Sequence, residues 1–238
     1  MPTVRAGPMI GLIVQIVLLA ILATTVSLGV AGWVTGLAYG FITFAALTRG
    51  LHGVRVGGFG PADWVTLTRA TLVGCAAALT ADSFHRSAPI EVLVAVATVA
   101  LVLDALDGQV ARRTGSASGL GARFDMEVDA FLILVLSVYV ARSMGAWVLA
   151  IGAMRYAFLV AGWAVHWMRG PVPQRFWAKV VAATQGVVLV FAAADILPAR
   201  LMVTALAVAL ALLVESFGRD IVWLWQHRVV EPHRSVAE

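Results

Sequence analysis

Residues 6–48, AGPMIGLIVQIVLLAILATTVSLGVAGWVTGLAYGFITFAALT, contain no charged side chain. This stretch is too long for the apolar segment of a cleaved signal peptide, so we expect no cleaved leader. A helix needs about 20 apolar residues to cross the hydrocarbon of a bilayer. The sequence therefore predicts two spans, Met9–Leu28 and Ala31–Leu47, with a turn near Gly29 and Gly32. A re-entrant hairpin is the alternative.

The composition of the whole chain also indicates a lipid environment. Of its 238 residues, 61% are hydrophobic and 13% are charged, and the mean hydropathy is +0.92. A soluble domain exposes much of its surface to water, and this sequence lacks the polar residues to cover it. Backbone N–H and C=O groups inside lipid must hydrogen-bond to one another, so only helices or closed barrels can span it. The segments lack the alternation of barrel strands, so we expect helices. The single cysteine, Cys75, lies in an apolar stretch and is expected to be a buried thiol.

Six more apolar segments follow the first two, so the predicted fold class is all-α. We expect a polytopic membrane helix bundle, with a six-span core in residues 61–225 and a tail in residues 226–238. Residues 1–60 would form the two N-terminal transmembrane helices and an interfacial connector, the glycine-rich Gly50–Asp63. The core spans are predicted at Trp64–Ala81, Pro89–Asp107, Asp125–Ala141, Ala146–Trp167, Ala178–Leu197 and Leu201–Glu215, the last running on toward Trp225.

Basic residues predict the orientation, because cytoplasmic loops of membrane proteins carry an excess of Lys and Arg. With eight spans and a cytoplasmic N-terminus, twelve basic residues fall on the cytoplasmic side and three on the other. The tail is then cytoplasmic, and we expect an integral protein of a bacterial cell membrane. The net charge of +4 reflects this bias beside anionic headgroups, and no nucleic-acid partner is expected. The twelve are Arg5, Arg49, Arg55, Arg112, Arg113, Arg123, Arg169, Arg175, Lys179, Arg219, Arg228 and Arg234, and the three are Arg86, Arg142 and Arg200.

Four aspartates are concentrated in residues 104–129, DALDGQVARRTGSASGLGARFDMEVD. Asp104 and Asp107 are three residues apart, and Asp125 and Asp129 are four apart, so each pair shares a helix face. The glycines between the pairs allow the chain to turn back and bring them together. Carboxylates at a membrane boundary need compensation, and divalent cations that prefer oxygen ligands supply it. The structural alternative is a set of helix-end aspartates paired with arginines.

The same stretch resembles the signature of the CDP-alcohol phosphatidyltransferase family, D-x2-D-G-x2-A-R-x(7–8)-G-x3-D-x3-D. Every fixed position matches, and the resemblance extends over the six-span core, which is then the catalytic core. It implies a metal-dependent enzyme of phospholipid biosynthesis that moves a phosphatidyl group from CDP-diacylglycerol, or a related CDP-alcohol, to a small alcohol and releases CMP. The matching residues are Asp104, Asp107, Gly108, Ala111, Arg112, Gly121, Asp125 and Asp129.

The resemblance also implies roles for individual residues. The four aspartates would hold two Mg²⁺ or Mn²⁺ ions, with Asp129 serving in addition as the catalytic base. The segment PADWVTLTR, residues 61–69, resembles the family's first core helix, and Arg69 should face the site rather than lipid. Asp63 is alternatively a helix N-cap. The candidate contacts of the CDP-lipid are Asp63, Trp64, Val65, Thr66, Gly108, Arg112 and Ser118.

Three basic residues are candidates for binding the acceptor. Arg155 lies mid-span, where it needs a polar cavity or an acidic partner. Arg175 and Lys179 are four apart and would share a helix face, which suits an anionic acceptor such as glycerol 3-phosphate or an inositol phosphate; cytoplasmic anchoring is the alternative. Residues 173–185, PQRFWAKVVAATQ, match the pattern of neither acceptor subfamily in full.

A transporter or channel with an acidic cation site is the alternative function. It would explain the spans and the aspartates, but not the Gly, Ala and Arg positions between them. Expected partners are the CDP-linked lipid, the small polar alcohol and membrane lipid, and homodimerisation is an expectation from the family alone.

Overall fold

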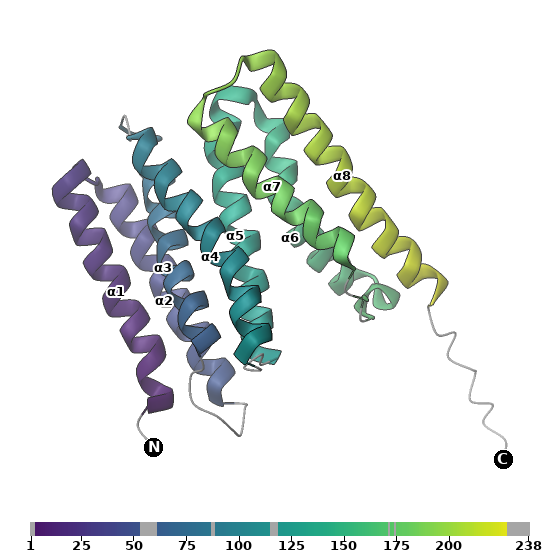
Figure 1. The fold of residues 1–238 in the computed structure, drawn as a ribbon, viewed down its shortest axis with the longest axis horizontal. Coiled ribbons are helices and arrows are strands. Elements are labelled where there is room, and N and C mark those ends of the chain that lie inside the picture. Colours follow the sequence, from purple (N-terminus) through teal and green to yellow (C-terminus); the bar gives the residue numbers. More distant parts are fainter. Residues whose placement is uncertain are drawn as a thin grey trace.

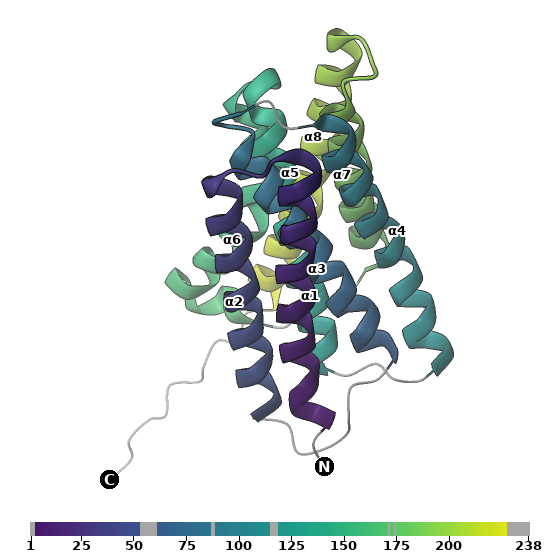
Figure 2. The same ribbon diagram turned by 90° about the vertical axis from the view of Figure 1, so that its left-hand side faces the viewer.

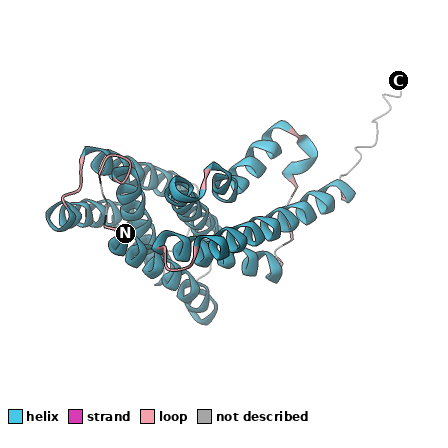
Figure 3. Cartoon of the chain, turned by 90° about the horizontal axis from the view of Figure 1, so that it is seen from above, coloured by secondary structure: helices cyan, strands magenta, loops and turns pink. Residues whose placement is uncertain are grey.

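The computed structural model describes residues 3–52, 61–86, 89–114, 119–170, 172–173 and 175–227. These residues form eight α-helices and two short 3-10 helices, and no strand occurs among them (Figure 3). The predicted all-α class is confirmed. The helices are α1 Thr3–Val26, α2 Val30–His52, α3 Pro61–Asp82, α4 Ile90–Thr114, α5 Gly119–Met144, η1 Ala146–Val148, α6 Leu149–Ala164, η2 His166–Arg169, α7 Phe176–Ala194 and α8 Ala199–Gln226.

The length and composition of the helices indicate an integral membrane protein. Six helical segments are long and apolar enough to cross a bilayer, namely α1, α2, α3, η1 with α6, α7 and α8. Large apolar side chains lie on the outside of these helices, with Val30 80%, Trp163 77% and Phe176 82% exposed. Such a surface is stable in lipid and unstable in water. The acid-bearing helices α4 and α5 are not among the six, so the total of eight spans stays a prediction.

Helix α3 lies at the centre of the N-terminal part of the bundle. Its span is 72% buried, whereas the spans of α1 and α2 are each 22% buried. It packs against α1, α2, α4 and α5, and Figure 2 shows α1 and α2 side by side in front of it. The buried run Cys75–Leu79 consists mainly of alanine, and small residues let neighbouring helices approach closely. The buried thiol predicted at Cys75 is confirmed.

Several predicted boundaries differ from the observed helix ends. The first turn is made by residues 27–29, where Ser27 has a φ of 55°, and Gly32 lies inside α2. The span predicted to end at Trp167 ends at Ala164, because Val165 takes an extended backbone conformation. Helix α4 continues beyond Asp107 to Thr114, and α5 begins before Asp125, at Gly119.

The connector prediction is partly wrong. Residues 50–52 belong to α2 and Asp63 belongs to α3, while residues 53–60 lie outside the described part of the chain. The turn between α1 and α2 is attached to the far end of α3. The Gly29 amide donates to Asp82 Oδ1 at 3.0 Å, and Arg86 Nη1 donates to the Ser27 carbonyl at 2.8 Å. These two bonds hold the N-terminal hairpin against the core.

The contact between α5 and α6 gives a first testable prediction, at Gly152. A β-carbon added to Gly152 would lie 2.5 Å from the Cα of Leu134, which is backbone and cannot swing aside. We expect Gly152→Ala to push α6 away from α5 and to lower the free energy of unfolding by about 1–3 kcal/mol, the usual cost of overpacking. The measurement is thermal unfolding of the purified protein in detergent.

Gly218 in α8 is the matched control, because a β-carbon there would meet no atom within 4 Å. Gly218→Ala should leave the unfolding temperature unchanged or raise it, since alanine is favoured over glycine inside a helix by about 1 kcal/mol. Equal unfolding temperatures for the two variants would contradict the packing described for α5 and α6.

Candidate active site

The candidate site lies at one end of the bundle, where three helix ends meet. The chain runs up and down, so the start of α3, the end of α4 and the start of α5 share the lower end in Figure 1. Asp104 projects from α4, and Asp125 and Asp129 project from successive turns of α5. Arg69, one turn beyond Thr66, comes from α3. Tertiary packing thus brings together side chains separated by up to 60 residues.

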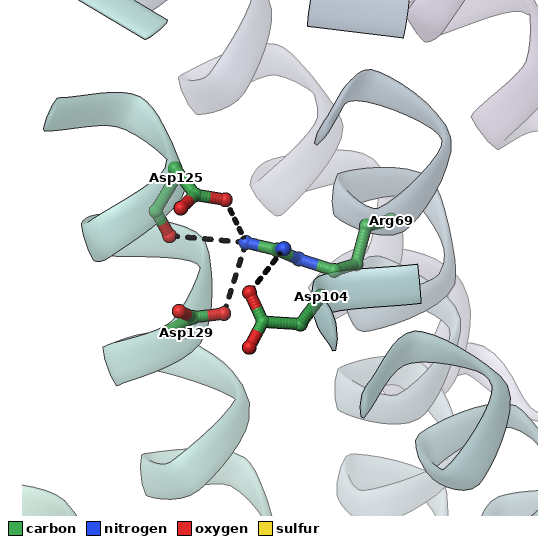
Figure 4. Close-up of polar contacts among 4 residues, drawn as sticks. All are labelled: Arg69, Asp104, Asp125 and Asp129. Carbon is green, nitrogen blue, oxygen red and sulfur yellow. Dashed lines mark hydrogen bonds and ion pairs between the residues drawn. The ribbon is translucent and has the colours of Figure 1, made fainter. Parts of the chain in front are cut away.

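Arg69 forms the centre of the site (Figure 4). Its Nη1 donates to Asp104 Oδ1 at 2.6 Å. Its Nη2 lies 2.9 Å from Asp129 Oδ1, pairs with Asp125 Oδ1 and donates to the Asp125 carbonyl at 3.2 Å. The expectation that Arg69 faces the site rather than lipid is confirmed. Its pairing with three aspartates corresponds to the alternative of aspartates paired with arginines, but the sequence did not identify Arg69 as the partner. A single basic residue inside α3 is a signal for such acidic partners.

The three carboxylates form a set of oxygens suited to a hard cation. Asp104, Asp125 and Asp129 each offer one oxygen, and these oxygens lie within 4.8 Å of one another. Their side chains are 35–38% exposed, so an ion can reach them. Three carboxylates and one guanidinium carry a formal charge of −2, which attracts a divalent ion. Carboxylate oxygen is the ligand that Mg²⁺, Mn²⁺ and Ca²⁺ prefer. The residues present therefore fit a divalent metal.

Four predicted site residues cannot be placed in this geometry. The side chains of Asp107 and Arg112 and the surroundings of Gly108 lie outside the described part of the structure, although the backbone of all three residues belongs to α4. Ser118 lies outside the described residues altogether. The helical backbone between Asp104 and Arg112 places residues 104, 108 and 112 on one face, since residues four apart are neighbours on a helix.

The first two turns of α3 carry the other candidate contacts of the CDP-lipid. Pro61 begins the helix and Asp63 lies in its first turn, so the alternative of Asp63 as the N-cap is wrong. Proline is favoured at the first helical position, and an acidic residue there interacts well with the helix dipole. Thr66 is buried, Trp64 is exposed, and Asp63 and Val65 are half-buried. All four residues lie within two turns of Arg69, at the end of α3 that bears the aspartates.

Two of the candidate acceptor residues, Arg155 and Arg175, form ion pairs with acidic residues other than Asp104, Asp125 and Asp129. Arg155 of α6 pairs with Glu127 of α5, so it has the acidic partner that its position required. Glu127 stands between Asp125 and Asp129 in sequence but on another face of α5. Arg175 lies 3.8 Å from Asp220 of α8, and Lys179 is exposed on α7. Arg175 precedes α7 with an extended backbone, so the prediction that it shares a helix face with Lys179 is wrong.

Comparison with known proteins identifies the family. The family model of the CDP-alcohol phosphatidyltransferases matches residues 60–214, which include α3 to α7, the aspartates and most of α8. No curated protein and no solved structure matches the chain significantly. The family match covers well over half of the 238 residues, and it coincides with the helices that carry the acidic site. The chain therefore belongs to the CDP-alcohol phosphatidyltransferase family.

Proposed function

We propose that the protein transfers a phosphatidyl group from CDP-diacylglycerol, or a related CDP-alcohol, to a small alcohol and releases CMP. The observation that carries the proposal is the convergence of Asp104, Asp125 and Asp129 at one end of the helices that match the family. Membership of the family supports phosphatidyl transfer from a CDP-alcohol. The acceptor is proposed to be anionic, with glycerol 3-phosphate and inositol phosphate as the first candidates.

The chemistry requires a base and a means of neutralising the pyrophosphate. Two divalent ions, Mg²⁺ or Mn²⁺, would be held by Asp104, Asp107, Asp125 and Asp129, and when bound they neutralise phosphate charge and favour in-line displacement. Asp129 is proposed as the base, because an alcohol is a poor nucleophile until a positioned carboxylate takes its proton. The acceptor oxygen then forms a bond to the lipid-bearing phosphorus, the bond from that phosphorus to the bridging oxygen breaks, and CMP leaves with that oxygen.

The remaining candidates have binding roles in this proposal. Gly108 gives the nucleotide close access to the α4 backbone, and Arg112 binds phosphate through its guanidinium fork. Asp63, Trp64, Val65 and Thr66 at the start of α3, together with Ser118, are proposed contacts of the cytidine. The acceptor would be bound by Arg155, Arg175 and Lys179. Exposure of Lys179 and the long 3.8 Å separation of Arg175 from Asp220 support their availability to an anion.

The proposed setting is a bacterial cell membrane with the site on the cytoplasmic side. The excess of basic residues on the side of the bundle that bears the site supports this orientation. Residues 1–60 are proposed as an N-terminal addition to a catalytic core in residues 61–225, with residues 226–238 as a cytoplasmic tail. A homodimer is part of the proposal on family grounds alone.

The test is a transfer assay on the purified protein in nanodiscs. CDP-diacylglycerol and Mg²⁺ or Mn²⁺ are combined with glycerol 3-phosphate, inositol 1-phosphate, inositol, serine or a phospholipid in turn. We expect release of CMP that depends on one acceptor, together with a matching lipid product. Absence of CMP with every acceptor, combined with cation flux in proteoliposomes, would instead favour the transporter.

A further inference from the structure

Arg69 is buried to a degree that is unusual for a charged side chain. It is 0% exposed, and it is the only basic residue in α3, the most buried span of the bundle. A guanidinium removed from water is stable only when opposite charges and acceptors surround it. Arg69 meets this condition by contacting Asp104 on α4 and both Asp125 and Asp129 on α5. Its charge therefore links three helices at the site.

The atoms used in these contacts matter for metal binding. Arg69 pairs with the Oδ1 atom of each of the three aspartates. A carboxylate has a second oxygen and can bind a cation with it while the first accepts a hydrogen bond. Hydrogen bonds of this kind fix the orientation of metal-binding side chains and tune their affinity. The guanidinium is fully buried, whereas the three carboxylate side chains that it contacts remain 35–38% exposed (Figure 4).

We propose that Arg69 is a positioning residue, which holds one oxygen of Asp104, Asp125 and Asp129 from the buried side and so presents the second oxygens to divalent cations. This inference rests on the metal dependence in the proposed function. Arg69 itself neither binds substrate nor takes part in proton transfer. Its effect is to keep three mutually repelling carboxylates converged before an ion arrives, which lowers the cost of assembling the site.

The opposite role would be competition, in which Arg69 fills the place of the cation and leaves when an ion binds. The surroundings of the side chain disfavour this role. Arg69 projects from a helix whose adjacent buried residues, Ala70 and Val73, are apolar. A guanidinium that left its aspartates would be buried without compensation, at a cost of several kcal/mol. The two roles predict opposite changes in metal affinity. Replacement of Arg69 weakens metal binding if Arg69 positions the aspartates, and tightens it if Arg69 competes with the ion.

The metal affinity of Arg69 variants distinguishes the positioning role from the competing role. Mn²⁺ binding to the purified protein in detergent is followed by electron paramagnetic resonance, without any substrate. We expect Arg69→Lys to weaken binding about tenfold and Arg69→Gln about 100-fold, the range found when groups that orient metal ligands are removed. Lysine keeps the charge but cannot span several carboxylates as a planar fork. Unchanged or tighter binding in folded Arg69→Lys would overturn the proposal.

Arg142→Lys is the matched control. Arg142 donates to Ser83 Oγ at 2.5 Å and lies 4.9 Å from the Phe84 ring, away from the three aspartates. Its replacement should leave Mn²⁺ affinity unchanged, and a fall like that of Arg69→Lys would overturn the proposal by showing a general loss of structure. If wild-type protein binds no Mn²⁺, the metal dependence of the proposed function fails together with this inference. If wild type binds Mn²⁺ and Arg69→Lys binds it equally well, only this inference fails.

A second measurement needs no variant, in case both replacements prevent folding. In an experimental structure of the wild-type protein with Mn²⁺ bound, we expect the Arg69 guanidinium to remain within hydrogen-bonding distance of Asp104, Asp125 and Asp129. A guanidinium displaced from all three carboxylates would establish competition and overturn the positioning role.

Discussion

Asp129→Asn is expected to reduce CMP release by at least about 10²–10⁴-fold, the usual contribution of a general base. Asparagine keeps the size of the side chain, but its amide cannot accept the acceptor's proton and binds a hard cation weakly. The variant should fold, because it removes one of three converging negative charges and leaves Arg69 paired with Asp104 and Asp125. The measurement is the rate of CMP release at saturating CDP-diacylglycerol and acceptor.

Asp195→Asn provides the control for this prediction. Asp195 is exposed after α7 at the other end of the bundle, and its φ of 51° is a conformation that asparagine also tolerates. Its activity should equal that of wild type. Wild-type turnover in Asp129→Asn, with an unchanged unfolding temperature, would remove Asp129 from the proposed mechanism.

Removal of divalent cations is expected to have an effect of similar size on the unmodified protein. Excess chelator should abolish CMP release, and Mg²⁺ or Mn²⁺ should restore it. The chelator should also lower the unfolding temperature, because the formal charge of −2 on the three aspartates and Arg69 lacks its counter-ion once the metal is removed. An ion present at 100 times its dissociation constant stabilises the folded state by about 2.7 kcal/mol. Both quantities are measured on one detergent preparation, before and after the metal is restored.

The double variant Asp104→Asn with Asp125→Asn tests where the ion acts. Without these two ligands, added Mn²⁺ should no longer raise the unfolding temperature, while Asp195→Asn should keep the full rise. Turnover in excess chelator would refute metal dependence. A metal-induced rise in stability that survives in the double variant would place the ion elsewhere in the protein.

The predicted helices were largely correct, and the errors lie at their ends. Long apolar segments identified every α-helix of the described chain, because hydrophobic length is a local property. The predicted spans ended at Asp107 and began again at Asp125, whereas α4 continues to Thr114 and α5 begins at Gly119, so glycines lie inside both helices. Glycine costs a helix about 1 kcal/mol, which neighbouring packing readily offsets. The break at Val165, where α6 ends, has no such signal in the sequence.

The candidate site was predicted unevenly, and Arg69 and Arg155 show why. Spacing within α5 placed Asp125 and Asp129 on one face, since residues four apart are neighbours on any helix. Spacing says nothing about which residue on a distant helix meets them. The pairing of Arg69 with the aspartates and of Arg155 with Glu127 depends on how α3 and α6 pack against α5.

The sequence by itself determined that this protein is an all-α membrane protein with a family signature in residues 104–129. Those properties follow from apolar length and from fixed local spacing. The tertiary structure alone decided that a buried arginine from α3 joins carboxylates of α4 and α5. The physical reason is that a guanidinium inside the bundle must be compensated by whatever charges packing brings within hydrogen-bonding distance, and local sequence does not encode that packing.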